Sequence, residues 1–446
     1  MGEWSRSVPV RYAPHMTELV FPKGFLWGSA TAAHQVEGNN TNSDWWEWEL
    51  RPDTKCKEPS GSAIEHYNRY TRDVALLMQL GLNSYRFSVE WARIEPSEGV
   101  FDSAQLDHYQ RMAEAVKKAK LTPIVTLNHF TLPQWLAKEG GWLSPKAPAL
   151  FERYVRRVVD RMGDNVVWYC TLNEPGAVAL GGYAGAWSFP PGTTGLANWK
   201  TAIANEIAAH KAARAAVKEI RPDAKVGLTC AMNEWEANGA GQPVMEYARK
   251  MFEDVFLEAA TDDEFLGVQT YTRARIELSL VEGTRARIGL ATNEEKWGPW
   301  AATQQSMATN DPGGSLPRTQ MGWEYRPAAV AVTVRRAAKL LPGKTLLVTE
   351  HGVGTDKDED RIRFIKEGLI ALHQTIEDGI PLAGYLHWSA FDNFEWALGY
   401  APKFGLIAVD RTTQERTIKP SARYLGEIAQ KNRVVVDSAP EPPSWG

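Results

Sequence analysis

The chain has 446 residues, of which 43% are hydrophobic and 23% are charged, and its formal net charge is −4. This composition is typical of a globular protein with a large core. So mild a charge gives no reason to expect a nucleic-acid groove or a basic membrane-binding face, and no apolar run is long enough to cross a bilayer.

Short strand-like segments alternate along the chain with longer helix-like segments. Several of the strand-like segments are continuous apolar runs, as expected of strands that are covered on both faces. We expect strands at residues 25–32, 84–89, 123–129, 166–174, 225–232, 265–271, 345–352 and 382–389.

The segments between these strands carry helix signals. Gly81 is a predicted C-cap of the first helix, which begins near Glu65, and Asp102 or Ser103 is a predicted N-cap of the second. Further helices are expected over residues 148–162, 202–220, 244–260, 327–341, 360–378 and 421–430.

Eight strand–helix units in succession predict an α/β fold with parallel strands and right-handed crossovers. Eight such units close into a single (β/α)8 TIM barrel. We expect one domain over residues 1–446, with a core at about 19–430, a loose N-terminal extension and a loose C-terminal tail. The surplus length lies in long βα loops at the C-terminal face, where they would enclose a deep pocket. These loops are 33–63, 175–198, 272–325 and 390–420.

Polar side chains gather at the C-terminal ends of the predicted strands. Because these ends meet at one mouth of a barrel, we expect the side chains to converge there. They belong to Gln35, Glu37, Arg86, His129, Asn173, Glu174, Tyr271, Glu350, His351, Trp388, Asp392, Glu395 and Trp396.

Two of these residues, Glu174 and Glu350, come from opposite sides of the predicted mouth. Cleavage of a glycosidic bond needs one carboxylic acid to protonate the leaving oxygen and a second carboxylate at the anomeric carbon. When the two are about 5–5.5 Å apart, the second attacks directly and configuration is retained. Enclosure would raise the pKa of Glu174, while Arg86 and the Tyr271 hydroxyl would keep Glu350 ionised.

Each residue also has a plainer explanation when it is taken alone. A single Glu is most often a solvated surface group. Asn173 could form a turn, His129 could be a structural histidine and Arg86 could form a buried ion pair. Trp388 and Trp396 could be core residues. From residue types and spacing alone, the sequence predicts a barrel enzyme with two carboxylates.

Ordered motifs at these same positions carry a more specific signal. They are FLWGSATAAHQVEGN at 25–39, YRFSVEWARI at 85–94, TLNEP at 171–175, VTEHG at 348–352, WSAFDNFEWALGY at 388–400 and FGL at 404–406. Over roughly residues 19–430 the chain thereby resembles glycoside hydrolase family 1, the β-glucosidase family.

The resemblance implies a role for each matching position. Glu174 would be the general acid/base and Glu350 the nucleophile, with Arg86 and Tyr271 holding the nucleophile charged. Trp388 would stack under the sugar. The hydroxyls of the nonreducing sugar would be bound by Gln35, His129, Asn173, Glu395 and Trp396.

The same resemblance narrows the substrate. Glu395 and Trp396 stand where the 6-phospho branch of the family carries phosphate-binding residues, which implies a neutral sugar. Glu174 is intact, whereas the myrosinase branch replaces it, which implies hydrolysis of ordinary O-glycosides.

Three departures from the family pattern lie near the expected sugar site. His351 stands in place of an Asn beside the nucleophile, Phe130 in place of a Trp after His129, and Gln269-Thr270-Tyr271 in place of Asn-Tyr-Tyr. They leave the glycone open between glucose, galactose, fucose or another sugar. The loop 272–325, with Trp297, Trp300 and Trp323, is the expected aglycone wall.

We therefore expect a retaining exo-β-glycosidase, first of all a β-glucosidase, that acts on small glycosides or oligosaccharides by double displacement. It would need no metal or cofactor. A transglycosidase on the same scaffold and a non-catalytic sugar-binding barrel remain as alternatives. Metal-dependent hydrolysis is disfavoured because the nine histidines include no HxH and no HExxH spacing.

The N-terminal stretch 1–16 has no charged region followed by an apolar one, so it does not resemble a secretory signal. The three cysteines are too few for a disulfide framework. These features predict a cytoplasmic protein without nucleic-acid or membrane partners. The oligomeric state stays open.

Overall fold

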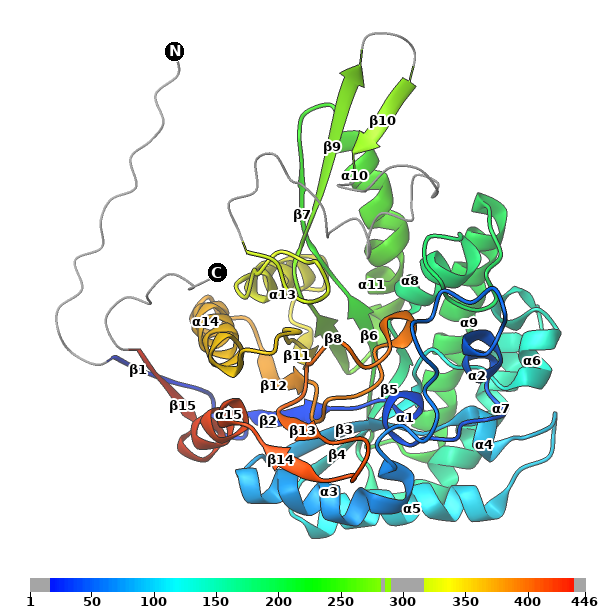
Figure 1. Cartoon of the computed structure of the whole chain (residues 1–446), viewed down its shortest axis with the longest axis horizontal. Coiled ribbons are helices and arrows are strands. Elements are labelled where there is room, and N and C mark those ends of the chain that lie inside the picture. The colour runs from blue at the N-terminus through cyan, green and yellow to red at the C-terminus, as the bar shows by residue number, and fades with distance from the viewer. Residues whose placement is uncertain (1–16, 282–284, 290–316, 437–446) are drawn as a thin grey trace.

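Eight parallel strands form a closed barrel in a computed structural model that describes residues 17–281, 285–289 and 317–436 (Figure 1). Around the barrel the strands follow the order β11-β12-β2-β3-β4-β5-β6-β8, so that β12 pairs with β2 and closes it. They are β2 (Leu26–Ala30), β3 (Ser84–Ser88), β4 (Thr122–Asn128), β5 (Trp168–Asn173), β6 (Lys225–Ala231), β8 (Phe265–Gln269), β11 (Thr345–Glu350) and β12 (Leu382–Trp388). The predicted (β/α)8 barrel is confirmed, with each strand inside its predicted segment or within one residue of it.

Apolar side chains fill the inside of the barrel below its mouth. Ile124 of β4, Trp168 and Cys170 of β5, Phe265 of β8 and Leu347 of β11 form one buried cluster. Since these strands come from different sides of the barrel, their side chains can meet only in its interior. The barrel is therefore closed by a packed apolar layer below the polar residues of the mouth.

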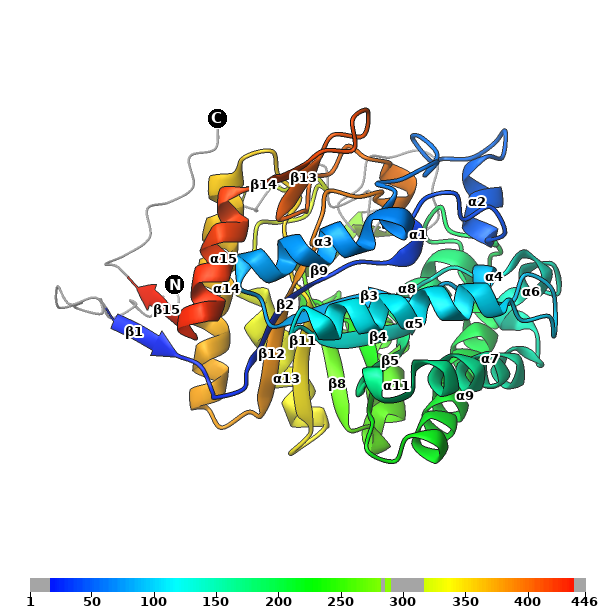
Figure 2. The same ribbon diagram turned by 90° about the horizontal axis from the view of Figure 1, so that it is seen from below.

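The predicted helices surround the strands (Figures 1 and 2). They are α3 (His66–Leu80), α5 (Ser103–Lys118), α7 (Ala147–Met162), α9 (Leu196–Ile220), α10 (Gln242–Arg249), α11 (Val255–Ala259), α13 (Ala329–Leu340), α14 (Asp358–Glu377) and α15 (Pro420–Lys431). Gly81 ends α3 in the left-handed conformation, and the Asp102 side chain accepts the Ala104 and Gln105 N–H groups at the start of α5. Both predicted caps are confirmed.

The segment predicted as one helix over 244–260 is interrupted. A π-turn, η4 (Lys250–Asp254), separates α10 from α11. Within it the buried Glu253 carboxylate accepts from the Asn233 N–H and the Trp235 indole N–H and pairs with Arg336. The extra residue of a π-turn changes the direction of the side chains that follow, and such turns concentrate near functional sites.

Long loops at the C-terminal face carry short elements of their own. The loop after β2 contains α1 (Ala33–Val36) and α2 (Asp44–Glu49), and the loop after β5 contains α8 (Pro175–Val178) and the π-turn η3 (Ala179–Tyr183). A sheet in the order β10-β9-β7 projects away from the barrel (Figure 1). Its strands are β7 (Glu234–Ala237), β9 (Arg273–Val281) and β10 (Arg285–Gly289). In the last loop, β13 (Ile407–Val409) pairs with β14 (Arg416–Ile418).

The two ends of the described chain lie side by side. β1 (Thr17–Val20) pairs antiparallel with β15 (Arg433–Val436), next to α15 (Figure 2). Ordered structure therefore extends a few residues beyond the expected core of 19–430. The predicted loose segments before Thr17 and after Val436 lie outside the described residues. No helix among the described residues is both long and apolar enough to span a membrane.

Candidate active site

One cavity opens at the C-terminal ends of the barrel strands, and most of the predicted site residues line it. They come from the ends of five strands, β4, β5, β8, β11 and β12, and from the loop after β12, so residues far apart in sequence meet at one place. Of the predicted residues, the lining includes His129, Asn173, Glu174, Tyr271, Glu350, Trp388, Glu395 and Trp396.

Glu350, the last residue of β11, is surrounded by donors. Arg86 Nη1 donates to Oε1 at 2.6 Å, and Gln269 Nε2 donates to the same oxygen at 2.9 Å. The Tyr271 hydroxyl donates to Oε2 at 2.5 Å. Both carboxylate oxygens are therefore held in place, and Glu350 is 3% exposed.

Two opposing effects act on the ionisation of Glu350. Burial raises its pKa above the ordinary value, because removal of water disfavours the charged form. The Arg86 charge and the hydrogen bonds from Tyr271, Arg86 and Gln269 oppose that rise. The partners predicted from sequence, Arg86 and Tyr271, are both present, but burial outweighs them and the net direction is upward.

Glu174 follows β5 in the left-handed conformation, with φ of 46°. Its backbone N–H donates to Thr229 O of β6 at 2.8 Å. Burial raises its pKa well above the ordinary value, and repulsion from Glu350 adds to the rise. At Glu174 burial and repulsion from Glu350 thus act in the same direction, whereas at Glu350 the Arg86 charge and the hydrogen bonds oppose burial.

Asn173 links the two sides of the site. Its Oδ1 accepts from Arg86 Nη2 at 2.5 Å and from Gln269 Nε2 at 2.9 Å, so its Nδ2 is the donor toward His129 Nε2 at 3.1 Å. His129 Nε2 must therefore be unprotonated. Burial and the nearby Arg86 charge lower the pKa of His129 well below its ordinary value. The neutral ring carries its proton on Nδ1, which has no partner among the described residues.

The loop after β12 supplies one aromatic side of the cavity. Trp388 Nε1 donates to Glu395 Oε1 at 3.2 Å, and burial raises the pKa of Glu395 to about 8. The rings of Trp388 and Trp396 both lie nearly parallel to that of His129, with interplanar angles of 18° and 14°. Flat apolar rings beside polar groups are a suitable surface for a sugar ring.

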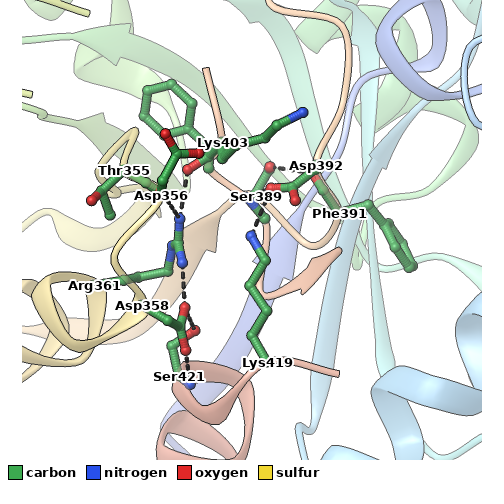
Figure 3. A network of polar contacts seen from close by, with 12 residues as sticks. Thr355, Asp356, Asp358, Arg361, Ser389, Phe391, Asp392, Lys403, Lys419 and Ser421 are labelled. Carbon is green, nitrogen blue, oxygen red and sulfur yellow. Dashed lines mark hydrogen bonds and ion pairs between the residues drawn. The ribbon is translucent and has the colours of Figure 1, made fainter. Parts of the chain in front are cut away.

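A buried polar network fixes this loop to the helices behind it (Figure 3). The Arg361 guanidinium of α14 pairs with Asp358 and donates to Thr355 O at 2.8 Å and Lys403 O at 2.5 Å. Lys419 donates to Asp392 at 2.8 Å. The loops after β11 and β12 are thereby joined, and Trp388 and Glu395 lie between these anchors in sequence.

Gln35 and Glu37 lie outside the lining. Gln35 Nε2 donates to Phe394 O at 2.6 Å, and its Oε1 has no partner among the described residues. Glu37 pairs with Arg93 at 3.0 Å and accepts from the Tyr109 hydroxyl. Both are buried in the loops that surround the mouth.

His351 does not lie at the sugar site, although its neighbour Glu350 does. Its Nδ1 lies 3.0 Å from the Tyr385 hydroxyl, its Nε2 lies 3.1 Å from Pro327 O, and its ring stacks on Phe364. Successive residues at the end of a strand point in opposite directions. The exchange of Asn for His at this position therefore affects the packing of β11 against the helices, not the cavity.

Gln269 is a site residue that the sequence does not single out. In the sequence it is only a departure from the family pattern, yet in the structure it donates to both Glu350 and Asn173. Its place at the end of β8, level with the other strand ends, was the available signal. Phe130 and Trp323 also line the cavity, whereas Trp297 and Trp300 lie outside the described residues. No group of side chains among the described residues is suited to hold a metal ion.

Comparisons with known proteins agree with this geometry. The model of glycosyl hydrolase family 1 matches residues 17–278 and 260–434. Beta-glucosidase A of Thermotoga maritima is 30% identical over 92% of this chain and 98% of its own length. A bifunctional beta-D-glucosidase/beta-D-fucosidase of Bifidobacterium breve is 33% identical over 90% of this chain and 96% of its own. The crystal structure of the beta-glycosidase BGL167 is 40% identical, with a TM-score of 0.79 over 95% of this chain and all of that one.

Proposed function

Because the chain belongs to glycosyl hydrolase family 1, we propose that Glu350 and Glu174 carry out its reaction as nucleophile and general acid/base. The protein is a glycoside hydrolase of the β-glycosidase kind, for which a retaining mechanism is typical. In that mechanism Glu350 attacks the anomeric carbon while Glu174 protonates the leaving oxygen, and water activated by Glu174 then releases the sugar.

One observation carries these roles: two carboxyl groups line one cavity in unlike surroundings. Glu350 receives hydrogen bonds from Arg86, Gln269 and Tyr271, which favour its charged form. The pKa of Glu174 is raised further, by burial and by the Glu350 charge. A difference in environment of this kind separates an acid from a nucleophile. Direct attack also requires the two groups to lie about 5–5.5 Å apart.

The other predicted site residues have supporting roles in the proposal. Arg86 and Tyr271 hold the nucleophile, and His129, Asn173, Glu395 and Trp396 bind hydroxyls of the nonreducing sugar. Trp388 provides the stacking surface. Gln35 lies outside the lining, and we propose that its Oε1, which has no partner among the described residues, accepts from a sugar hydroxyl when sugar is bound. We propose glucose as the first glycone, since relatives are named beta-glucosidases, with fucose second because of the bifunctional relative. A panel of aryl β-glycosides tests the order.

Covalent trapping tests the nucleophile. An activated 2-fluoro β-glycoside of the accepted sugar should inactivate the enzyme and add one glycosyl mass to the peptide that contains Glu350. The Glu350→Gln variant should fold, bind sugar and take up no label. Label on another residue would overturn the assignment. Binding of the reagent without label or turnover would instead favour a sugar-binding barrel that has no catalysis.

We also propose a cytoplasmic location. The support is the state of the three cysteines, Cys56, Cys170 and Cys230, none of which forms a disulfide. Fractionation of the producing cells with an antibody against the chain would test this. Recovery in the secreted fraction would contradict it.

A further inference from the structure

The cavity has two unlike parts. Its polar part surrounds Glu350 and contains the hydrogen-bonding groups described above. Its second part, here called the apolar chamber, is enclosed by Trp187, Phe189, Met232, Trp235, Ala248 and Phe252. These residues come from the loops after β5 and β6, from β7, and from α10 and η4, so the chamber lies beside Glu174, which directly follows β5.

Aromatic rings connect the two parts without a break. Phe130 packs against Trp396 at 5.0 Å between ring centroids and against Phe189 at 5.5 Å. Trp187 in turn packs against Phe189 at 5.4 Å and against Phe252 at 6.4 Å. At the far side, Ala248 and Ile276 belong to one buried apolar cluster that packs against Trp235. The wall that begins at the sugar-binding part is thus mainly apolar.

Few hydrogen-bonding groups interrupt this wall. Among the described residues that line the chamber, Asn233 and Thr272 alone carry an amide or hydroxyl side chain. The Thr272 hydroxyl already donates to Glu324 O at 2.9 Å, and the Trp235 indole N–H already donates to Glu253 at 2.6 Å. A second sugar would bring several hydroxyl groups into this space, and apart from those that the Asn233 amide could reach they would lose water without a protein partner to replace it. An apolar group of similar size would instead gain from every unit of area that it buries.

We infer that the apolar chamber binds a bulky hydrophobic aglycone, so that the preferred substrates are amphiphilic β-glycosides and not β-linked disaccharides. Aryl glycosides, long alkyl glycosides and glycosides of polycyclic alcohols share this chemistry. The inference rests on the proposed function, because it takes the polar part of the cavity to hold the sugar.

A ladder of alkyl glycosides tests the inference. The methyl, butyl, hexyl and octyl β-glycosides of the accepted sugar are compared below their micelle concentrations, with the β-1,4-linked disaccharide of the same sugar alongside. Full burial of one methylene corresponds to about fourfold in kcat/KM. We expect at least a tenfold rise from butyl to octyl, and octyl above the disaccharide. If kcat/KM does not rise along the alkyl series, or if the disaccharide is cleaved as efficiently as the octyl glycoside, the inference is overturned while the proposed function stands. Failure to cleave any glycoside overturns the proposed function as well.

Two methionines supply a matched pair of variants. Met232 lines the chamber, whereas Met162, equally buried on α7, does not. Met232→Gln keeps the size of the side chain and places an amide in the wall, so the octyl-to-methyl ratio of kcat/KM should fall about tenfold. Met162→Gln should leave that ratio within twofold of the unsubstituted enzyme. Equal effects of the two variants, or no change in Met232→Gln, would contradict the assignment.

A filling variant provides a second, independent readout. Ala248→Leu adds volume at the far end of the chamber. In this variant kcat/KM should stop rising at a shorter alkyl chain than in the unsubstituted enzyme, while hydrolysis of the methyl glycoside is kept. If kcat/KM of the variant still rose up to the octyl glycoside, the aglycone would bind elsewhere and the inference would be overturned.

Discussion

At the scale of single residues, Glu174 and Glu350 differ only in what surrounds them. Glu350 must be ionised to attack, so its activity is lost as pH falls through its pKa. Glu174 must be protonated to act as an acid, so activity is lost as pH rises through its pKa. Both pKa values are raised by burial, that of Glu174 by more. A bell-shaped profile of kcat/KM against pH follows, with both limbs displaced upward from the ordinary pKa of a glutamate, and a pH–rate measurement checks it.

Gln269 is the residue through which this profile can be moved. Replacement by Leu removes a donor from Glu350, which raises the pKa of that carboxylate, so the acidic limb of the kcat/KM profile should shift to higher pH. The rate at the optimum should fall roughly tenfold. Thr270→Val is a matched control, since the neighbouring hydroxyl bonds Thr333 at 2.7 Å, away from Glu350. An unmoved acidic limb in Gln269→Leu would show that the amide does not act on the nucleophile.

Glu174→Ala separates acid catalysis from binding. Glycosides with a poor leaving group need the proton, so their kcat/KM should fall by about 10²–10⁴-fold. Activated aryl glycosides leave without help and should form the glycosyl-enzyme at close to the original rate. The measurement is kcat/KM against leaving-group pKa. Equal losses across the series would contradict the role of Glu174 as the acid.

At the scale of elements, the buried network around Arg361 determines how the loops after β11 and β12 are held (Figure 3). Arg361 is fully buried, and its guanidinium is shared between Asp358 of its own helix and the carbonyl oxygens of Thr355 and Lys403. Asp358 also accepts from the Ser421 N–H and hydroxyl at the start of α15. The network thus connects two helices to the two loops that follow the nucleophile and Trp388.

Arg361→Met should lower the free energy of unfolding by about 3–5 kcal/mol, because Asp358 and two carbonyl groups lose their partner. Arg335→Met is the control, since its ion pair with Asp378 is exposed and worth less than about 1 kcal/mol. Denaturant unfolding compares the two. If both variants lost the same small amount of unfolding free energy, the network would not be holding the loops.

At the scale of the whole molecule, the fold begins and ends at one place. Asn432 ends α15 in the left-handed conformation, with φ of 52°. Its Oδ1 accepts from the indole N–H of Trp27 in β2 at 2.9 Å, and its Nδ2 donates to Phe21 O at 2.7 Å. One side chain therefore joins the last helix to the first barrel strand and to the segment before it.

Asn432→Gly keeps the backbone conformation but leaves the buried Trp27 N–H without a partner, which should cost about 1–3 kcal/mol. Asn432→Asp retains an acceptor for that N–H and loses the donor to Phe21, so its stability should lie between those of Gly and Asn. Thermal unfolding of the three proteins gives the order. If Asn432→Gly were as stable as the unsubstituted protein, the side-chain connection would contribute nothing to stability.

The sequence alone determined the barrel, the order of its strands and the presence of two carboxylates at its mouth. These depend on local periodicity and on ordered motifs, which can be read without knowledge of distant contacts. The prediction of one continuous helix over 244–260 was wrong. The π-turn that interrupts it lies where Glu253 contacts Asn233, Trp235 and Arg336, and no local pattern shows these contacts.

Side-chain direction and long-range contact were decided only by the tertiary structure. Glu350 and His351 are adjacent in sequence, yet one lines the cavity and the other packs against Phe364, because neighbouring residues of a strand point to opposite sides. Gln269 contacts the nucleophile because the end of β8 lies beside the end of β11 in the closed barrel. The division of the cavity into a polar and an apolar part likewise depends on which distant loops meet above the barrel, and no local pattern carries that information.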